Sequence, residues 1–168
     1  MATAATATTA TARTRPGAAW RLVGLGLLVL SLYGAQGTAM AKMVIFSAVS
    51  GQVLLGGKPV AGAVIERDWK WAWKDEAGAD RATTSADGQF KLPIVERSSF
   101  MGSLLPHSPM VRQTMLIKHE GKRYKAWMFD KEDYNNNGEL KGKPIRITCR
   151  LETDPVRRGD LFGICEPD

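Results

Sequence analysis

The sequence predicts an all-β protein, a β-sandwich of seven strands with mostly antiparallel pairing. Three observations lead to this class. Apolar side chains recur at every second position in one segment after another, and Gly, Pro and Asp-Gly turn signals separate these segments at short intervals. No stretch beyond the N-terminal region has a convincing helical period. Alternation with frequent turns is typical of two stacked sheets that each bury one face.

The predicted strands follow one another closely. The first spans residues 44–55, and we expect Gly51 to mark a bulge or a close backbone approach. A second strand at residues 63–68 continues through residues 69–74, ahead of a polar loop at residues 75–80. A hairpin around Asp87-Gly88 is predicted between residues 81–85 and 89–95. The remaining strands are predicted at residues 111–120, 123–129 and 145–151.

Two short blocks resemble a known family. Residues 50–65 contain Ser-Gly-Gln-Val, a Gly56-Gly57 turn, and Pro-Val-Ala-Gly-Ala-Val-Ile; residues 83–90 read Thr-Thr-Ser-Ala-Asp-Gly-Gln-Phe. This arrangement resembles the carboxypeptidase regulatory-like, transthyretin-like β-sandwich, whose module is not catalytic. The chain is also similar to a group of uncharacterised small bacterial secreted proteins that add a Tyr-x-x-Asn-Gly-Glu-Leu segment (residues 134–140) and a terminal Cys pair. The resemblance implies fold and compartment.

The first 41 residues are predicted to be a cleaved secretory signal peptide. An Ala/Thr tract with three arginines and no acid precedes an apolar run at residues 22–34, and Ala39-Met40-Ala41 offers the small residues of a cleavage site. The run of about 13 residues is shorter than the roughly 20 of a permanent span. An uncleaved anchor is the alternative. We expect cleavage near Ala41/Lys42, export to the periplasm, and a single β-sandwich domain over residues 42–168.

Net charge bears on the class of partner, and cysteine content bears on the disulfide pairing. The 23 basic and 17 acidic residues give a net charge of +6, and removal of the three signal arginines lowers it to +3. The cations are scattered rather than gathered in a stripe, so nucleic acid is not an expected partner. Cys149 and Cys165 are the two cysteines, and in an oxidising compartment we expect them to form a structural disulfide.

The sequence offers no catalytic constellation. His107 and His119 are the two histidines, and neither has a His-x-x-Glu or His-x-His neighbour that would supply zinc ligands. We therefore predict a protein that is not an enzyme and has no cofactor. A hydrolase built around His119 is the alternative from another class.

One loop resembles half of a calcium site. Asp133, Asn135, Asn137 and Gly138 match Asp-x-Asn-x-Asn-Gly, whose oxygens suit a hard cation. Pro144 stands at the twelfth position, where a bidentate Glu would complete the coordination. A plain Asn-rich turn is the alternative interpretation.

Two apolar features are candidates for a binding surface. Trp69, Trp71 and Trp73 alternate with Lys70, Ala72 and Lys74, which puts the three indoles on one face. That face is either core, a protein-binding surface or a platform for sugar rings. The long connection at residues 96–110 carries an apolar patch that either binds a partner or covers one end of the sandwich; its main residues are Phe100, Leu104 and Leu105.

The function predicted from these features is that of an exported, non-enzymatic periplasmic protein that binds a protein partner. Immunity-like neutralisation of another secreted protein and association with the cell envelope are two versions of this function. The alternative is a carbohydrate- or cell-wall-binding module that uses the Trp69/Trp71/Trp73 row. The two differ in the partner, a protein or a polysaccharide, and neither needs a permanent membrane span.

Overall fold

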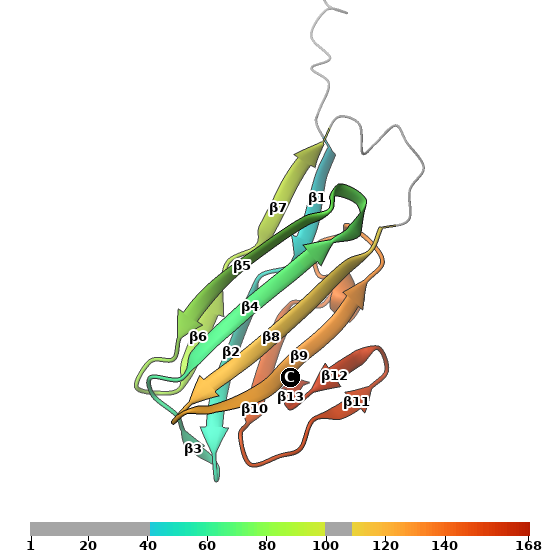
Figure 1. The fold of residues 1–168 in the computed structure, drawn as a ribbon. Coiled ribbons are helices and arrows are strands. Elements are labelled where there is room, and N and C mark those ends of the chain that lie inside the picture. The colour runs from blue at the N-terminus through green and yellow to red at the C-terminus, as the bar shows by residue number, and fades with distance from the viewer. Residues whose placement is uncertain (1–40, 100–108) are drawn as a thin grey trace, which may run out of the picture. The chain divides into compact units, whose positions relative to one another are not determined.

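The computed structural model describes residues 41–99 and 109–168, and within these ranges the chain is all-β (Figure 1). The described residues form no α-helix, and their helical turns are the short 3-10 segments η1 (Ala72–Lys74) and η3 (Gly138–Leu140). Two sheets face each other with the apolar core between them. The β-sandwich class is therefore confirmed, whereas the described residues form thirteen strands, several of them short, in place of the predicted seven.

The larger sheet has six antiparallel strands in the order β11-β12-β9-β8-β4-β5. Its long central strands pair over most of their length, which fixes the inward and outward faces of the sheet. The strands are β4 (Val64–Trp71), β5 (Glu76–Thr83), β8 (Val111–His119), β9 (Lys122–Lys131), β11 (Val156–Arg158) and β12 (Leu161–Gly163).

The smaller sheet is built around β2, which pairs with strands on both sides. Its order is β13-β10-β2-β3, and β6 also pairs with β2. β2 and β10 pair in parallel. The sequence predicted mostly antiparallel pairing and did not identify this parallel pair. These strands are β2 (Val49–Leu55), β3 (Lys58–Pro59), β6 (Gln89–Leu92), β10 (Ile145–Arg150) and β13 (Cys165–Pro167).

A two-stranded ribbon continues the β2–β6 pair beyond two bends. It consists of β1 (Ala41–Phe46) and β7 (Val95–Ser99), and the bends lie at residues 47–48 and 93–94. The predicted first strand at residues 44–55 is therefore interrupted at Ser47 and runs on through Gly51. Gly51 instead makes the close approach that was expected, because a Cβ there would lie 2.5 Å from the carbonyl oxygen of Ile147.

The Asp87-Gly88 turn connects two different sheets, so the predicted hairpin is wrong. β5 belongs to the larger sheet and β6 to the smaller one. Gly88 has a φ of 73°, and its carbonyl accepts a hydrogen bond of 2.9 Å from the amide of Val53. The turn chemistry was predicted correctly, but contact with β2 sends the chain across to the other layer.

The chain from residue 69 to residue 80 also differs from the prediction. β4 ends at Trp71, the turn η1 carries residues 72–74, and Asp75 adopts a φ of 48°. β5 then starts at Glu76, so the predicted polar loop is mostly strand. The inward-facing residue of β5 opposite Trp69 is Gly78, and its lack of a side chain leaves room for the indole.

Burial follows the predicted alternation in β8 and β10 but not throughout β9. In β9 the side chains of Ala126 and Trp127 are both buried although they are neighbours. A register shift between Met115 and Leu116 of β8 accompanies this change. An extra residue in one strand moves the following side chains to the other face, so strict alternation fails at this point.

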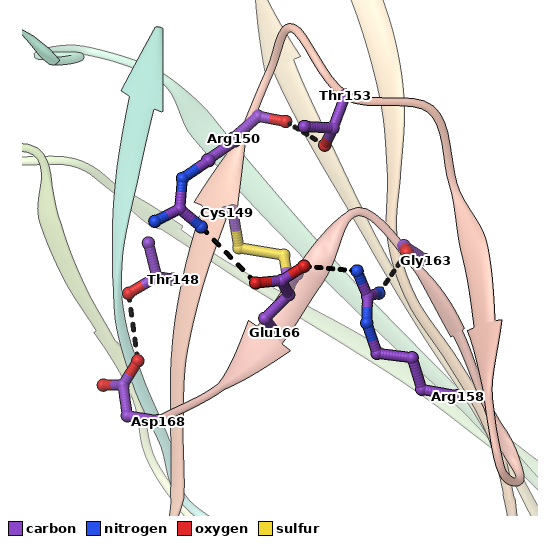
Figure 2. Close-up of a disulfide and its surroundings, with 9 residues drawn as sticks. Thr148, Cys149, Arg150, Thr153, Arg158, Gly163, Glu166 and Asp168 are labelled. Atoms are coloured by element: carbon purple, nitrogen blue, oxygen red, sulfur yellow. Dashed lines mark hydrogen bonds and ion pairs between the residues drawn. A yellow bond between two sulfur atoms is a disulfide. The ribbon is translucent and has the colours of Figure 1, made fainter. Parts of the chain in front are cut away.

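The predicted disulfide is present and joins the C-terminal strand to the smaller sheet. Cys149 of β10 and Cys165 of β13 are direct partners in the antiparallel register. Figure 2 shows the Glu166 carboxylate between Arg150 and Arg158, with which it forms ion pairs. The Thr148 hydroxyl donates to the Asp168 side chain at 3.0 Å. The disulfide and these polar contacts hold β13 in the sheet.

We predict that replacement of both cysteines by alanine lowers the free energy of unfolding by about 3 kcal/mol, because the closed loop no longer restricts the unfolded chain. The bond closes a sequence separation of 16 residues. Urea denaturation measures the change, and the wild-type protein with excess reductant is the matched control. Equal stability of the oxidised wild type and the variant would contradict a stabilising role.

Candidate functional site

The structure places the first two tryptophans of the predicted row in the core. Trp69 is 9% exposed and Trp71 is 2% exposed. Both point inward because they follow Ile65 and Arg67 in the alternation of β4, a strand that is paired on both sides. The surface interpretation is therefore corrected for these two residues, since buried indoles offer neither a protein-binding row nor a stacking platform.

Trp73 lies beyond the end of β4, in η1, and packs partly buried against the core. The Trp73 ring centroid is 5.4 Å from the Trp71 ring centroid. The Lys74 ammonium lies 4.2 Å from the Trp73 ring centroid. Trp71 also donates a hydrogen bond of 2.8 Å from Nε1 to the Tyr134 hydroxyl. The aromatic side chains thus tie η1 to the Asn-rich loop.

Four predicted residues receive no structural description. Phe100, Leu104 and Leu105 of the apolar patch, together with His107, lie outside the described residues. His119 is described, and its Nε2 is 3.7 Å from the Glu120 carboxylate. Within residues 41–99 and 109–168, no hydroxyl or thiol nucleophile forms a hydrogen bond with His119.

A lysine ammonium lies inside the loop that resembles half of a calcium site. Lys131 Nζ donates to the carbonyl of Asn135 at 2.6 Å and is 3.9 Å from Asp133 Oδ1. Asp133 also accepts a hydrogen bond of 2.7 Å from the amide of Asn135. The described residues contain no group of three or more His, Cys, Asp or Glu side chains arranged to hold a metal. A metal ion at this loop would have to compete with the Lys131 charge.

Glu139 is the centre of a buried charged network. Its carboxylate accepts from Lys131 Nζ at 2.8 Å and from Gln113 Nε2 at 2.8 Å. It also accepts from both the amide and the hydroxyl of Ser47, at 3.1 and 2.7 Å. All four residues are buried. The network therefore joins β8, β9, η3 and the bend between β1 and β2.

Arg67 extends this network to the second bend. Its guanidinium is fully buried and forms two hydrogen bonds with Asp80, at 2.8 and 2.5 Å. It also donates to the carbonyl of Pro93 at 2.7 Å and to that of Ser47 at 3.4 Å. One side chain thus binds the backbone at both places where the smaller sheet bends into the β1–β7 ribbon.

These network residues were not singled out from the sequence. Arg67 and Lys131 occupy inward positions of alternating strands, where a charged residue signals a buried partner. Glu139 belongs to the Tyr-x-x-Asn-Gly-Glu-Leu segment that was noted only as a family feature. The signal was thus present, but the partners come from distant parts of the chain.

The described surface has several hollows, of which two bear on binding. One lies on the outer face of the larger sheet, has a volume of about 260 Å³, and includes Met128 and Phe162. The other lies on the outer face of the smaller sheet, has a volume of about 740 Å³, and includes Ser50, Lys91 and Arg146. None of the described segments forms a helix with the length and apolar character needed to cross a membrane.

The fold and the paired cysteines define an all-β sandwich protein with a disulfide-tied C-terminal strand. A family model described as a domain of unknown function, DUF6795, matches residues 49–154, more than half of the 168 residues. The chain therefore belongs to the DUF6795 family. Arg67, Lys131 and Glu139 lie within the matched range. Neither the curated proteins nor the solved structures contain a match to the chain.

We predict that Lys131 and Glu139 are strongly coupled. Lys131→Met and Glu139→Gln each leave a buried charge without its partner, which costs about 3–5 kcal/mol. The double variant loses both charges, so its free energy of unfolding should exceed by at least about 1 kcal/mol the value expected from adding the two single effects. Urea denaturation of the four proteins tests this, and additive effects would contradict a functioning ion pair.

The network should also make the protein sensitive to acid. Burial by itself raises the pKa of Glu139, but hydrogen bonds from Lys131 and Gln113 and the Lys131 charge outweigh it and hold the pKa below the usual 4.5. A lowered carboxyl pKa contributes stability above the unfolded-state pKa, and this contribution disappears as the pH falls through the folded-state value.

We therefore expect Glu139→Gln to lose less unfolding free energy than the wild type between neutral pH and about pH 3. Glu66→Gln is the control, because a hydrogen bond from Lys118 also lowers the pKa of Glu66 but on an exposed face. The difference in acid dependence between Glu139→Gln and the wild type should persist in about 1 M NaCl. The corresponding difference for Glu66→Gln should be reduced by salt screening. The same acid dependence in Glu139→Gln and wild type would refute the assignment.

Proposed function

We propose that this chain is an exported, non-enzymatic binding protein of the carboxypeptidase regulatory-like, transthyretin-like type, and that it engages a protein partner in the periplasm. The fold type is supported by the two blocks that carry the resemblance. In the first, Gly51 permits a close approach to Ile147, and Gly56 and Gly57 turn the chain with positive φ. In the second, Gly88 makes the turn between the sheets.

The observation that carries the proposal is an apolar patch on the outer face of the larger sheet. Met128 of β9 is 36% exposed and lies opposite Phe162 of β12. We call these two residues the Met128 patch. Four charged residues also line the hollow that Met128 and Phe162 form: Arg112, Asp130, Arg157 and Asp160.

An apolar centre within a charged rim is the usual composition of a protein interface, where Met, aromatic residues and Arg are enriched. The rim pair Arg112 and Asp130, 3.1 Å apart, is exposed and therefore available to a partner. A protein that neutralises another secreted protein, as in the immunity-like version of this function, needs such a rigid surface and no reactive group.

The use of the buried charged groups also supports binding rather than catalysis. Glu139 and Lys131 satisfy each other and the Ser47 bend, and Arg67 is held by Asp80 and two backbone carbonyls. Groups held in this way maintain the fold, because their donors and acceptors are already occupied. Export is supported by the paired cysteines, which suit an oxidising compartment.

The carbohydrate-binding alternative loses the platform first considered for it, because Trp69 and Trp71 are buried. An exposed aromatic row would have supplied the stacking surface for neutral sugars. A sugar-binding role therefore needs a different part of the surface.

We expect Met128→Glu to abolish capture of the partner, because a carboxylate in the apolar centre must be desolvated on binding. The tagged protein, its Met128→Glu variant and a Leu55→Glu control are incubated with periplasmic extract, and the bound proteins are quantified by mass spectrometry. Leu55 is also an exposed apolar residue, at 43%, but it belongs to the smaller sheet. The same proteins bound by Met128→Glu, or none bound by the wild type, would contradict the proposal.

A further inference from the structure

The outer face of the smaller sheet carries a row of residues that the proposed function does not use. In β2, Val49, Gly51 and Val53 face the core, so Ser50 and Gln52 face outward. Ser50 lies opposite Lys91 of β6 on one side and Arg146 of β10 on the other. Lys91, Ser50 and Arg146 form the cationic row, with strands about 4.8 Å apart.

The cationic row lies where two hollows meet. The larger hollow, of about 740 Å³, has the row on one side and includes Ala48, Pro93, Ile94, Asn136, Asn137 and Pro144. The smaller hollow, of about 250 Å³, contains the same three residues and continues along the sheet to Gln52, Gln89 and Thr148. The row is therefore shared by a continuous, open trough across β6, β2 and β10.

The larger hollow of this trough is positively charged. Lys91 and Arg146 are both exposed and form no ion pair with any described residue, whereas Arg112 and Arg150 on other outward positions have carboxylate partners. No acidic side chain lines the larger hollow. Asp168 lines the smaller one, and its carboxylate accepts a hydrogen bond from the Thr148 hydroxyl. The complementary ligand is anionic.

The groups beside the two cations indicate which kind of anion fits. The trough presents the hydroxyls of Ser50 and Thr148 and the carboxamides of Gln52, Gln89, Asn136 and Asn137. The Thr148 hydroxyl donates to Asp168, and Gln52 Nε2 donates to the Asp87 carbonyl at 2.9 Å. Such groups exchange hydrogen bonds with sugar hydroxyls, while Lys and Arg bind carboxylates. The backbone of Asn137 is fixed, because its backbone N–H donates to the buried Ser47 hydroxyl at 2.8 Å.

A peptide fits this trough less well. β2 pairs with β6 and β10 at Ser50, so a peptide strand cannot add to its backbone. The apolar core residues along the trough, Val49 and Leu92, are buried and offer no deep pocket for an anchoring side chain.

We propose that this trough binds an acidic polysaccharide, with Lys91 and Arg146 on the carboxylates and the hydroxyl and carboxamide groups on the sugar hydroxyls. The site is independent of the Met128 patch, which belongs to the other sheet. It also needs no exposed tryptophan, because charge rather than ring stacking supplies most of the affinity.

Polygalacturonate is the probe, and its fully methyl-esterified form is the uncharged control with the same sugar backbone. Binding to the purified protein is measured by isothermal titration calorimetry at low and moderate salt. The Lys91→Ala/Arg146→Ala variant should weaken binding at least about tenfold and reduce the salt dependence of the affinity. The Lys122→Ala/Lys125→Ala variant removes the same charge from β9, outside the trough, and should bind within about twofold of the wild type.

Several results would overturn the proposal. These are an equal loss of affinity in both double variants, equal binding of the esterified polymer, and absence of polygalacturonate binding by the wild type. Tighter binding of polyglutamate than of polygalacturonate would assign the trough to acidic peptides instead. Thermal unfolding of each variant shows that folding is retained, and the Met128→Glu variant should bind polygalacturonate normally, which separates this test from that of the protein partner.

Discussion

The fold depends on how the backbone at Ser47 is held. At this residue the chain leaves the β1–β7 ribbon and enters the smaller sheet, so its peptide groups drop out of the strand ladders. Glu139 accepts from the Ser47 amide and hydroxyl, and Arg67 donates to its carbonyl. A buried peptide group without a partner is costly, so these two charged side chains make the bend compatible with a closed core.

The same two residues have charges of opposite sign and belong to different elements. Arg67 extends from β4 of the larger sheet, and Glu139 from the η3 turn after β9, where Lys131 neutralises it. Burying such ions is expensive unless each is paired and hydrogen-bonded. The arrangement satisfies that condition, and it gives the ribbon one position relative to the sandwich. A purely apolar contact would pack the layers but would not select this bend.

The alternation of apolar residues predicted the inward positions of those strands whose burial follows the local sequence. The inward positions of β8 and β10, from Val111 to Ile117 and from Ile145 to Cys149, followed from alternation because β8 pairs with β4, and β10 with β2, without interruption. The Cys149–Cys165 pairing followed from the cysteine count and the expected oxidising compartment. The interruption at Ser47, the shift beside Trp127 and the crossing at Gly88 did not, since each is set by a partner far along the chain.

The site was harder to predict for the same reason. Three tryptophans in alternation look alike whether they face core or solvent. The burial of Ile65 and Arg67 on the same face of β4 shows that Trp69 and Trp71 face the core. The residues that the structure brings forward, such as Met128 with Phe162 or Lys91 with Arg146, are unremarkable in sequence. They become significant because strand register places Met128 beside Phe162 on one outer face, and Lys91 and Arg146 on either side of Ser50 on the other.

Amide hydrogen exchange at Ser47 tests the central claim most directly, because this amide belongs to no strand ladder and is protected only if Glu139 holds it. We expect the Ser47 amide to exchange as slowly as the buried ladder amide of Ile117, through global unfolding. Exchange at the rate of an exposed loop amide, while Ile117 stays protected, would show that the bend is open and would contradict the account.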